Sequence, residues 1–385
     1  MKILYHHRTV SKDGMDVHIS EMIKAFRAQG HEVILVAPSL GAQDFGGGGG
    51  WVDAIRSRLP RFVGEILELG YNLAAYRNLS RAIQAERPDA IYERYALFLL
   101  AGIWAKRRFR LPLVLEINSP LFAERRDHGG LSLRAIGRWC ESWAWRNADA
   151  CLPVTHVLAK DVRDAGVPDT RITVIPNGID PAEFSEQRDG SGVRGRYGLE
   201  GKLVLGFTGF VRPWHGLDRI IRAIAEFGPS ANIHLLVVGD GPARASLEEL
   251  ARELSVSDRL TFTGVVQRAD MATHIAAFDI ALQPDATAYA SPLKLVEYMA
   301  MGKAIIAPDQ PNIRELLDHE RTGLLFASSD PEGMRKALLR LIEEKDLRET
   351  LGHAAAAEVR QRPLTWASNA TRVVRILKGL AKTGA

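Results

Sequence analysis

The chain has few cysteines and no long hydrophobic run. Cys140 and Cys151 are its only cysteines, and their spacing fits neither a metal centre nor a redox pair. They indicate a reducing compartment rather than a disulfide framework. No stretch of about 18 apolar residues occurs, so no membrane-spanning helix is expected. The first residues read as a short strand rather than a secretory signal, and we therefore expect a cytoplasmic protein.

Motifs of several common enzyme classes are also absent. No G-x-G-x-x-G segment occurs, so a nicotinamide oxidoreductase is poorly supported. There is no G-x-x-x-x-G-K-[ST] loop, which argues against a P-loop NTPase. No G-x-S-x-G elbow supports acyl hydrolysis. No cluster of His, Cys and Asp has the spacing of metal ligands, so we expect no bound metal.

Size and charge are those of an ordinary globular protein. At 385 residues the chain is long enough for two domains. Its hydrophobic content of 46% and charged content of 25% are typical of globular chains. The net charge of +4 favours anionic substrates or surfaces, but it does not by itself indicate nucleic acid.

Strand and helix patterns alternate along both halves of the chain. This alternation predicts an α/β fold with two doubly wound parallel sheets. We expect a first domain over residues 1–183 and a second over residues 199–360. The stretch between them, rich in Gly, Arg and Asp, is typical of a linker.

Residues 51–81 have helical spacing and a basic edge. One interpretation is a helix packed on the first sheet with a solvated basic face. The other is a helix in the interface of an anionic membrane, with its apolar side chains in the lipid. The side chains concerned are the apolar Trp51, Ile55, Leu59 and Phe62 and the basic Arg56, Arg58 and Arg61.

The segment SPLKLVEYMAMG at 291–302 is the most informative stretch of the chain. Ser291 suits a helix N-cap, and a proline suits the first helical position. Lys294 then falls in the first turn, where the helix dipole disfavours a cation unless an anion binds there. Glu297 follows one turn later and could accept hydrogen bonds from hydroxyls on that anion. The alternative is an ordinary buried helix with a surface Lys294–Glu297 pair.

Other groups that bind phosphate are expected at the same edge of the second sheet. Gly209, Gly239 and Gly264 each follow a predicted strand, where they allow close approach of a ligand to the backbone. Arg212 lies in the first of these loops. Cations, free N–H groups and a helix N-terminus together predict a phosphate site.

These motifs together resemble the retaining nucleotide-sugar glycosyltransferases of family 4, which have the two-domain GT-B fold. The resemblance runs nearly end to end. It is strongest in GFVRPWHG (209–216), VGDGP (238–242), the 291–302 segment and GLLF (323–326). The first half contributes GHEV (30–33) and IPNGID (175–180). The resemblance implies that residues 361–385 form a helix that crosses back to the first domain.

The resemblance also implies roles for single residues. Arg212, Ser291, Leu293 and Lys294 would hold the donor diphosphate, and Glu297 would bind the ribose. Gly14 would let the first domain approach the donor phosphate. The nucleotide pocket would be lined by Gly239, Asp240, Gly241, Pro242 and Val265.

The sequence departs from the pattern of this family at three positions. Tyr289 replaces the first of two glutamates, the one that usually touches the transferred sugar. His215 replaces the lysine that usually follows the phosphate-binding arginine. Asn118 replaces a histidine often found after a strand of the first domain.

The expected reaction is metal-independent transfer of a sugar to a hydroxyl group with retention of configuration. Arg212, Lys294 and Asn118 would be its catalytic residues. A surface polysaccharide or glycoconjugate is the expected setting, with a sugar or lipid-linked glycan as acceptor and peripheral contact with the inner face of a membrane. The alternatives are a nucleotide-sugar 2-epimerase of the same fold and a non-catalytic sugar-nucleotide-binding subunit.

Overall fold

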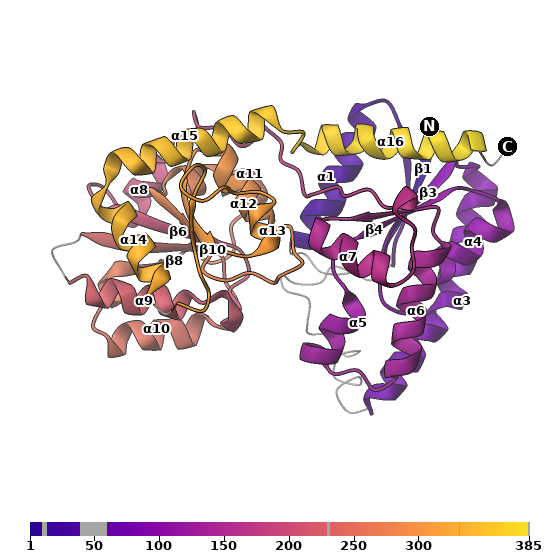
Figure 1. The fold of residues 1–385 in the computed structure, drawn as a ribbon, viewed down its shortest axis with the longest axis horizontal. Helices are drawn as coiled ribbons and strands as arrows, with labels where there is room; N and C mark the ends of the chain where they lie inside the picture. Colours follow the sequence, from indigo (N-terminus) through magenta and orange to yellow (C-terminus); the bar gives the residue numbers. More distant parts are fainter. Residues whose placement is uncertain (10–13, 39–59, 229–231, 331, 384–385) are drawn as a thin grey trace. The chain divides into compact units, whose positions relative to one another are not determined.

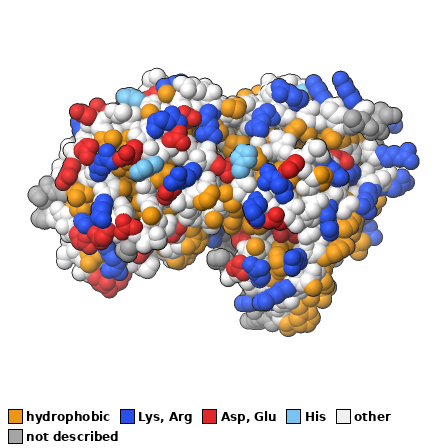
Figure 2. Space-filling view, in the orientation of Figure 1, with side chains coloured by type: hydrophobic (Ala, Val, Ile, Leu, Met, Phe, Trp, Pro, Cys, Tyr) orange, Lys and Arg blue, Asp and Glu red, His pale blue; other side chains and the backbone are white. Residues whose placement is uncertain are grey.

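The chain forms two compact units (Figure 1). In the computed structural model, the described residues are 1–9, 14–38, 60–228, 232–330 and 332–383. The first unit comprises Met1–Pro176, Tyr289–Ser291 and Trp366–Ala385. The second comprises Asn177–Ala288 and Pro292–Thr365. Figure 2 shows side chains of both charge signs interspersed over each unit.

The first unit is built on a five-stranded parallel sheet. Its strand order is β2-β1-β3-β4-β5. The strands are β1 (Lys2–His6), β2 (Glu32–Val36), β3 (Ala90–Arg94), β4 (Leu113–Ile117) and β5 (Ala150–Pro153). The helices are α1 (Gly14–Ala28), α3 (Arg61–Glu86), α4 (Ala101–Phe109), α5 (Leu121–Glu124), α6 (Arg134–Asn147), α7 (His156–Asp164) and α16 (Trp366–Thr383).

Helices cover both faces of this sheet. Leu4, Ile91 and Leu115 point into one core, which they share with α3, α4, α6 and α7. The opposite face holds Tyr92 of β3, whose ring lies 5.6 Å from the ring of Phe26 on α1. Because adjacent strand residues point to opposite faces, the buried strands have almost continuous apolar runs. The predicted parallel α/β architecture is confirmed for this unit.

A network of buried charges lies where β3 and β4 end. The register places Arg94 of β3 opposite Glu116 of β4, and the two form an ion pair. His18 of α1 lies 3.1 Å from the Glu116 carboxylate, and the Tyr92 hydroxyl donates to it at 2.5 Å. Burial alone would raise the pKa of Glu116, but His18 and Arg94 more than offset it and hold the pKa well below its usual range. The carboxylate therefore stays charged and joins α1, β3 and β4.

A second buried carboxylate, Glu141 of α6, has the opposite pKa shift. It accepts hydrogen bonds from the Phe122 amide at 3.0 Å and the Tyr95 hydroxyl at 3.1 Å. Burial raises the pKa of Glu141 to about 7, and these two hydrogen bonds only partly oppose that rise. This group therefore binds a proton more tightly in the folded than in the unfolded chain.

Replacing Glu141 by glutamine is expected to remove a pH-dependent destabilisation. Below the unfolded pKa the carboxyl is protonated in both states and costs nothing. As the pH rises from the unfolded pKa towards 7, the unfolded chain releases this proton while the folded chain retains it, so the free energy of unfolding falls; above the folded pKa of about 7 the loss levels off. The wild type should lose on the order of 2 kcal/mol of unfolding free energy between pH 5 and pH 8 relative to E141Q. Urea unfolding of both proteins at the two pH values measures this, and parallel pH profiles would contradict it.

The second unit is built on a six-stranded parallel sheet. Its strand order is β11-β10-β9-β6-β7-β8. The strands are β6 (Leu203–Thr208), β7 (Ile233–Val238), β8 (Leu260–Phe262), β9 (Ile280–Leu282), β10 (Ala304–Pro308) and β11 (Leu324–Phe326). The helices are α8 (Ser191–Tyr197), α9 (Leu217–Glu226), α10 (Arg244–Glu253), α11 (Arg268–Ala276), α12 (Leu293–Ala300), α13 (Pro311–Arg314), α14 (Gly333–Glu343) and α15 (Lys345–Gln361).

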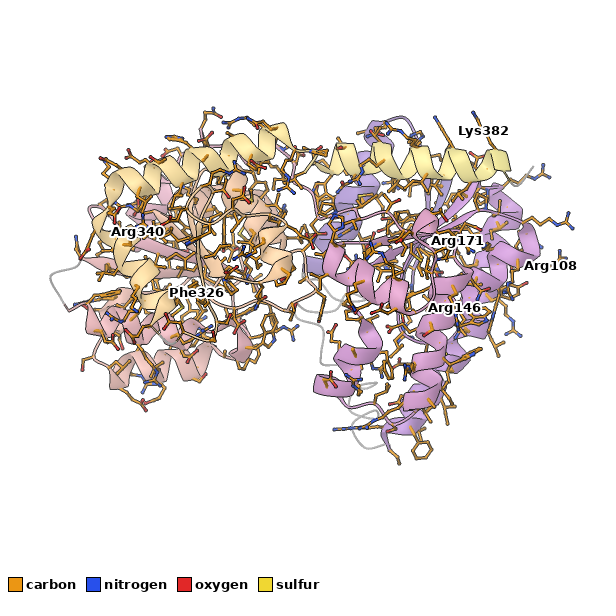
Figure 3. All side chains as sticks on the ribbon, viewed as in Figure 1. Arg108, Arg146, Arg171, Phe326, Arg340 and Lys382 are labelled. Atoms are coloured by element: carbon orange, nitrogen blue, oxygen red, sulfur yellow. The ribbon has the colours of Figure 1, made fainter. Side chains whose placement is uncertain are left out.

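Two cores lie on the two faces of this sheet. Val204 and Leu205, neighbours in β6, belong to different cores, as period-2 alternation requires. Phe326, at the end of β11, is 3% exposed (Figure 3). Helices therefore pack on both faces, and the predicted doubly wound sheet is confirmed here too.

The stretch expected to be a linker is partly ordered into the second unit. Residues 191–197 form α8, and the buried Val193 and Leu199 join one of its two cores. A polar, glycine-rich composition predicted a loop, but these two apolar side chains are enough to anchor a short helix.

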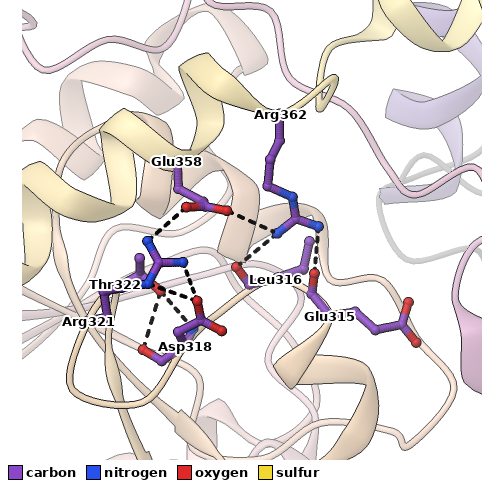
Figure 4. Close-up of polar contacts among 7 residues, drawn as sticks. All are labelled: Glu315, Leu316, Asp318, Arg321, Thr322, Glu358 and Arg362. Carbon is purple, nitrogen blue, oxygen red and sulfur yellow. Dashed lines mark hydrogen bonds and ion pairs between the residues drawn. The ribbon is translucent and has the colours of Figure 1, made fainter.

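A polar cluster fixes the turn between α13 and β11 to helix α15 (Figure 4). Arg321 donates to Asp318 at 2.9 Å and to Glu358 at 3.0 Å. Arg362 donates to the backbone carbonyl of Glu315 at 2.7 Å and lies 3.8 Å from Glu358. These contacts anchor the end of α15 just before the chain leaves the second unit after Thr365.

Candidate functional site

The order of strands in the second sheet creates a switch point beside β6. The chain passes from β6 to β7 and β8, and then returns to the other side of β6 with β9. Loops after β6 and β9 therefore leave the carboxyl edge of the sheet in opposite directions. In open α/β sheets ligands bind at such an edge. The loop at 209–216 follows β6, and α12 follows β9, so both predicted phosphate-binding segments meet here.

Glycines allow the loops after β6 and β7 to touch. A Cβ atom on Gly239 would lie 2.1 Å from the carbonyl oxygen of Gly209, and one on Gly241 would lie 2.4 Å from that of Val211. Gly239 also has a φ of +142°, which side chains rarely allow. The Val211 amide donates to the Asp240 carbonyl at 2.9 Å. Backbone of two loops thus forms one surface at the sheet edge.

Helix α12 begins one residue later than its sequence suggested. It starts at Leu293 with Pro292 in the capping position, and no side chain caps it. The prediction that Ser291 is its N-cap is therefore wrong, because the backbone of Pro292 is still extended. Lys294 and Glu297 lie on the helix as expected. Leu293 is half-buried at its first position.

The ammonium of Lys294 lies at the edge of the sheet. It sits 3.7 Å from the ring centroid of Phe207, and a Cβ atom on Gly209 would be 3.4 Å from it. Within the described residues, no ion pair or hydrogen bond to this ammonium is present. Burial lowers the pKa of Lys294 to about 7, and the charge of Glu297 opposes this only in part. An anion beside Gly209 would hold the ammonium in its charged form.

Arg212 and His215 lie in the loop after β6. The Arg212 guanidinium is exposed and stacks 5.0 Å from the ring of Phe210. His215 is 7% exposed, and its Nδ1 accepts from the Arg212 amide at 3.1 Å. Burial, together with Lys294 and Arg212, lowers the pKa of His215 to about 2. The imidazole is therefore neutral, and it shapes the loop rather than supplying the charge of the family lysine.

Glu297 is held by an arginine that the sequence did not point to. Arg268, at the start of α11, forms an ion pair with the Glu297 carboxylate. Its guanidinium also lies 4.6 Å from the ring of Phe184. The surface pair of Lys294 with Glu297, considered as an alternative, is not formed. Arg268 is 29 residues from Glu297, and only the packing of α11 against α12 brings them together.

The Arg268–Glu297 pair is expected to be strongly coupled in stability. Glu297 is 5% exposed, so Arg268→Ala leaves a buried carboxylate without its ion pair. We expect a loss of about 2 kcal/mol, much of it recovered when Glu297→Ala is added. A double-mutant cycle by urea unfolding measures the coupling. Additive single-variant effects would show that the pair does not matter.

The remaining donor-site residues of the second unit surround the same edge. Asp240 pairs with Arg244 at 3.0 Å and accepts from the amide of Gly241 at 2.8 Å. Pro242 and Val265 are exposed, Val265 by 55%. Val265 follows Gly264, which has a φ of +72° and bridges Gly239. Because the Asp240 carboxylate is paired with Arg244, these residues offer a ligand mainly backbone groups and apolar surface.

Four of the predicted site residues belong to the first unit, namely Gly14, Asn118, Tyr289 and Ser291. Gly14 begins α1. The Asn118 amide, just after β4, donates to Glu116 and is half-buried. The carbonyl of Tyr289 accepts from the Thr155 hydroxyl at 2.9 Å.

The position of Tyr289 was the main departure from the family pattern. Its hydroxyl donates to Glu124 of α5 at 3.1 Å, and its side chain packs against the core of the first unit. Tyr289 and Ser291 thus belong to the first unit, and Lys294 belongs to the second. Tyr289, which replaces the family glutamate, is therefore hydrogen-bonded to the Glu124 carboxylate.

Neither a metal-binding cluster nor a membrane-spanning helix occurs among the described residues. No group of three or more His, Cys, Asp or Glu side chains is placed to hold a metal ion there. In that same part of the chain, none of the helices has the length and apolar character needed to cross a bilayer.

Sequence comparison relates both halves of the chain to known families. Residues 13–178 match the family described as Glycosyl transferase 4-like domain, and residues 202–344 match Glycosyl transferases group 1. A GDP-mannose-dependent alpha-mannosyltransferase of Mycobacterium tuberculosis is 26% identical over 86% of this chain and 85% of its own length. A D-inositol 3-phosphate glycosyltransferase of Thermomonospora curvata is 27% identical over 96% of this chain and 91% of its own.

Solved structures show the same fold. HepE from Anabaena, in complex with UDP and glucose, superposes with a TM-score of 0.77 at 20% identity, covering 98% of this chain and all of that one. Sucrose-phosphate synthase from Thermosynechococcus elongatus gives 0.77 at 18% identity and covers 100% of both chains. The GT-B fold expected from the sequence is confirmed.

Proposed function

The chain belongs to the group 1 glycosyltransferases of the family 4 type, and we propose that it transfers a sugar from a nucleotide-sugar to an acceptor hydroxyl with retention of configuration. The observation that carries the proposal is the placement of Lys294. Its ammonium lies at the start of α12 beside Gly209, at the switch point of the second sheet. A donor diphosphate at this edge would place its negative charge beside the Lys294 ammonium and the N-terminus of α12.

The cations of the second unit are suited to stabilise the leaving diphosphate. When the bond from the sugar to the phosphate oxygen breaks, its electron pair stays on the diphosphate. Lys294, Arg212 and the free N–H groups of α12 would stabilise that charge electrostatically. The acceptor hydroxyl forms the new bond on the same face, and its proton passes to a phosphate oxygen. This route assigns no step to a metal ion.

A thermal-shift screen over nucleotide sugars tests the proposal. A ligand that binds only the folded state raises the melting temperature by mass action. Relatives and neighbours named for GDP-mannose and UDP make guanosine and uridine donors the first to test. The stabilising donor is then incubated with candidate acceptors, and NMR reads the anomeric configuration of the product. Isomerisation without acceptor would indicate a 2-epimerase, and binding without turnover would indicate a non-catalytic subunit.

Binding of the nucleoside diphosphate is expected to take up a proton at pH 8. Lys294 has a pKa of about 7 in the free protein, so it is mostly neutral at that pH. A bound diphosphate raises this pKa, and the phosphate itself is already ionised because its own pKa is about 6. Affinity should therefore fall as the pH rises above 7. Calorimetry in buffers of different ionisation enthalpy counts the protons, and Lys294→Met should abolish the uptake.

For the acceptor, we propose a sugar or lipid-linked glycan, with peripheral membrane contact at the start of α3. The described part of the predicted 51–81 segment begins at residue 60; Trp51, Ile55, Arg56, Arg58 and Leu59 lie outside the described residues. Within α3, Phe62, Ile66 and Leu67 are 46%, 52% and 62% exposed. Figure 2 shows hydrophobic side chains gathered at this end of the first unit. Apolar side chains beside arginines are typical of interfacial helices.

Flotation with vesicles tests the membrane contact. The wild type should float with vesicles that contain phosphatidylglycerol, and Phe62→Ser with Leu67→Ser should reduce the bound fraction. Leu35 is 50% exposed and lies in β2 rather than in α3, so Leu35→Ser serves as the matched control. Equal flotation of all three proteins would remove the support for this contact.

A further inference from the structure

A pocket in the first unit lies away from the residues discussed so far. It has a volume of about 590 Å³ and is formed between α16 and the turn that joins α1 to β2. Its lining residues are Gln29, His31, Thr371, Val374, Arg375, Lys378, Gly379 and Lys382. His31 immediately precedes β2, so the pocket is at the amino edge of the sheet. Ligands of reactions on such sheets bind at the carboxyl edge, so this pocket needs a different explanation.

Three cations of α16 line the pocket from one stripe of the helix. Arg375, Lys378 and Lys382 are spaced by three and four residues, which places them on one face. All three are exposed. Figure 3 shows Lys382 at the C-terminal end of this helix. Like charges at these spacings repel one another and destabilise a helix that has no counter-charge.

No acidic side chain is among the described residues that line the pocket. The acid nearest in sequence to His31 is Glu32, which is bound to Lys2 at 3.0 Å. Gln29 is occupied as well, because its amide donates to the Ala367 carbonyl at 2.7 Å and ties α16 to α1. Within the described chain, no ion pair or hydrogen bond of the Arg375, Lys378 or Lys382 side chains is found.

Burial, and to a smaller extent this positive charge, lowers the pKa of two neighbouring groups. Burial lowers the pKa of His31, and the terminal amine of Met1 and Lys378 lower it further. Burial also lowers the pKa of Arg372, and Arg375 adds to that effect. The dipole of α16 favours cations only in its last turn. It therefore accounts for Lys382 but not for Arg375, which lies two turns earlier.

We propose that this pocket binds an anion that carries two or more phosphate groups. An arginine fork and two lysine ammonium groups suit phosphate oxygens. The pocket volume is within the range of small-molecule sites. The anion would dock against α16 and the α1–β2 turn together, and so would stabilise their contact. Its source is either a free polyphosphorylated metabolite or a phosphorylated lipid headgroup.

Tripolyphosphate is the probe for the test. Titrations are made in the Lys294→Met variant, so that the diphosphate site of the second unit contributes little. In that background, Arg375→Ala with Lys378→Ala should weaken binding at least tenfold. The matched control removes one exposed arginine and one exposed lysine elsewhere, by Arg108→Ala with Lys336→Ala, and should leave affinity unchanged (Figure 3 labels Arg108). No saturable binding, or equal loss in both double variants, overturns the proposal.

Vesicles distinguish the two sources. Flotation of the wild type and of the Arg375→Ala, Lys378→Ala variant is compared on phosphatidylcholine vesicles with and without phosphatidylinositol phosphate. If the variant loses flotation and tripolyphosphate releases the wild type, the headgroup is the source. If tripolyphosphate binds and flotation is the same for both proteins, the source is a free anion. Either result supports the pocket, and neither depends on whether the chain transfers sugar.

Discussion

Lys294→Met is expected to lower kcat by about 10²–10³-fold while the protein stays folded, as loss of one preorganised donor does in other enzymes. The ammonium faces the edge where the leaving diphosphate develops charge, and methionine fills the same volume without that charge. Because burial disfavours the ammonium in the free protein, its removal should leave the free energy of unfolding unchanged or slightly higher. Loss of turnover with undiminished stability separates catalysis from folding.

Steady-state kinetics on the wild type and Lys294→Met, with circular dichroism and thermal unfolding beside them, make this measurement. The control is Lys336→Met, since Lys336 is an exposed lysine of α14 on the same unit. The control should keep full kcat. Full turnover by Lys294→Met would falsify the assignment of Lys294 to the leaving diphosphate.

Gly241→Ala should damage both the site and the fold of the second unit. A Cβ atom there would lie 2.4 Å from the carbonyl oxygen of Val211 and 2.6 Å from its amide nitrogen. Backbone cannot rotate away as a side chain can, so the loop that carries Arg212 must move. Displacement of about 1 Å in a catalytic loop can cost about 10²-fold in rate. Overpacking of this kind also costs about 1–3 kcal/mol of unfolding free energy.

Gly192→Ala is the control for this substitution. Gly192 lies in α8 of the same unit, and a Cβ atom there meets nothing within 4 Å. Alanine should be neutral or slightly stabilising in that helix. Steady-state kinetics and thermal unfolding of Gly241→Ala and Gly192→Ala measure the two effects. Equal behaviour of Gly241→Ala and Gly192→Ala would mean that the two loops need not touch.

The period of the apolar residues was enough to predict both sheets. Strands such as β4 are buried on both faces and therefore show continuous apolar runs, a pattern that survives in any parallel α/β arrangement. Local composition was less reliable where two apolar residues decide the outcome. Val193 and Leu199 pack into a core of the second unit and so order part of a glycine-rich stretch. The backbone of Pro292 is extended, so α12 starts at Leu293 rather than at Pro292.

The candidate site was predictable where its chemistry is local to one segment. The Lys294–Glu297 spacing and the glycines after β6 and β7 are visible in the sequence, because a helix start and a strand end are short-range features. Arg268 was not predictable, since its contact with Glu297 depends on how α11 packs beside α12. The same holds for the ring of Phe207 beneath the Lys294 ammonium.

What the sequence by itself determined is the two-sheet α/β architecture and the residue types at the edge of the second sheet. Periodicity and strand–loop junctions are encoded locally, so they are visible in the sequence without the structure. The tertiary structure decided the charge states and the partners. Burial beside Phe207 brings the pKa of Lys294 near neutrality, and Arg268 holds Glu297. These depend on desolvation and on contacts between residues far apart in the chain, which no local pattern contains.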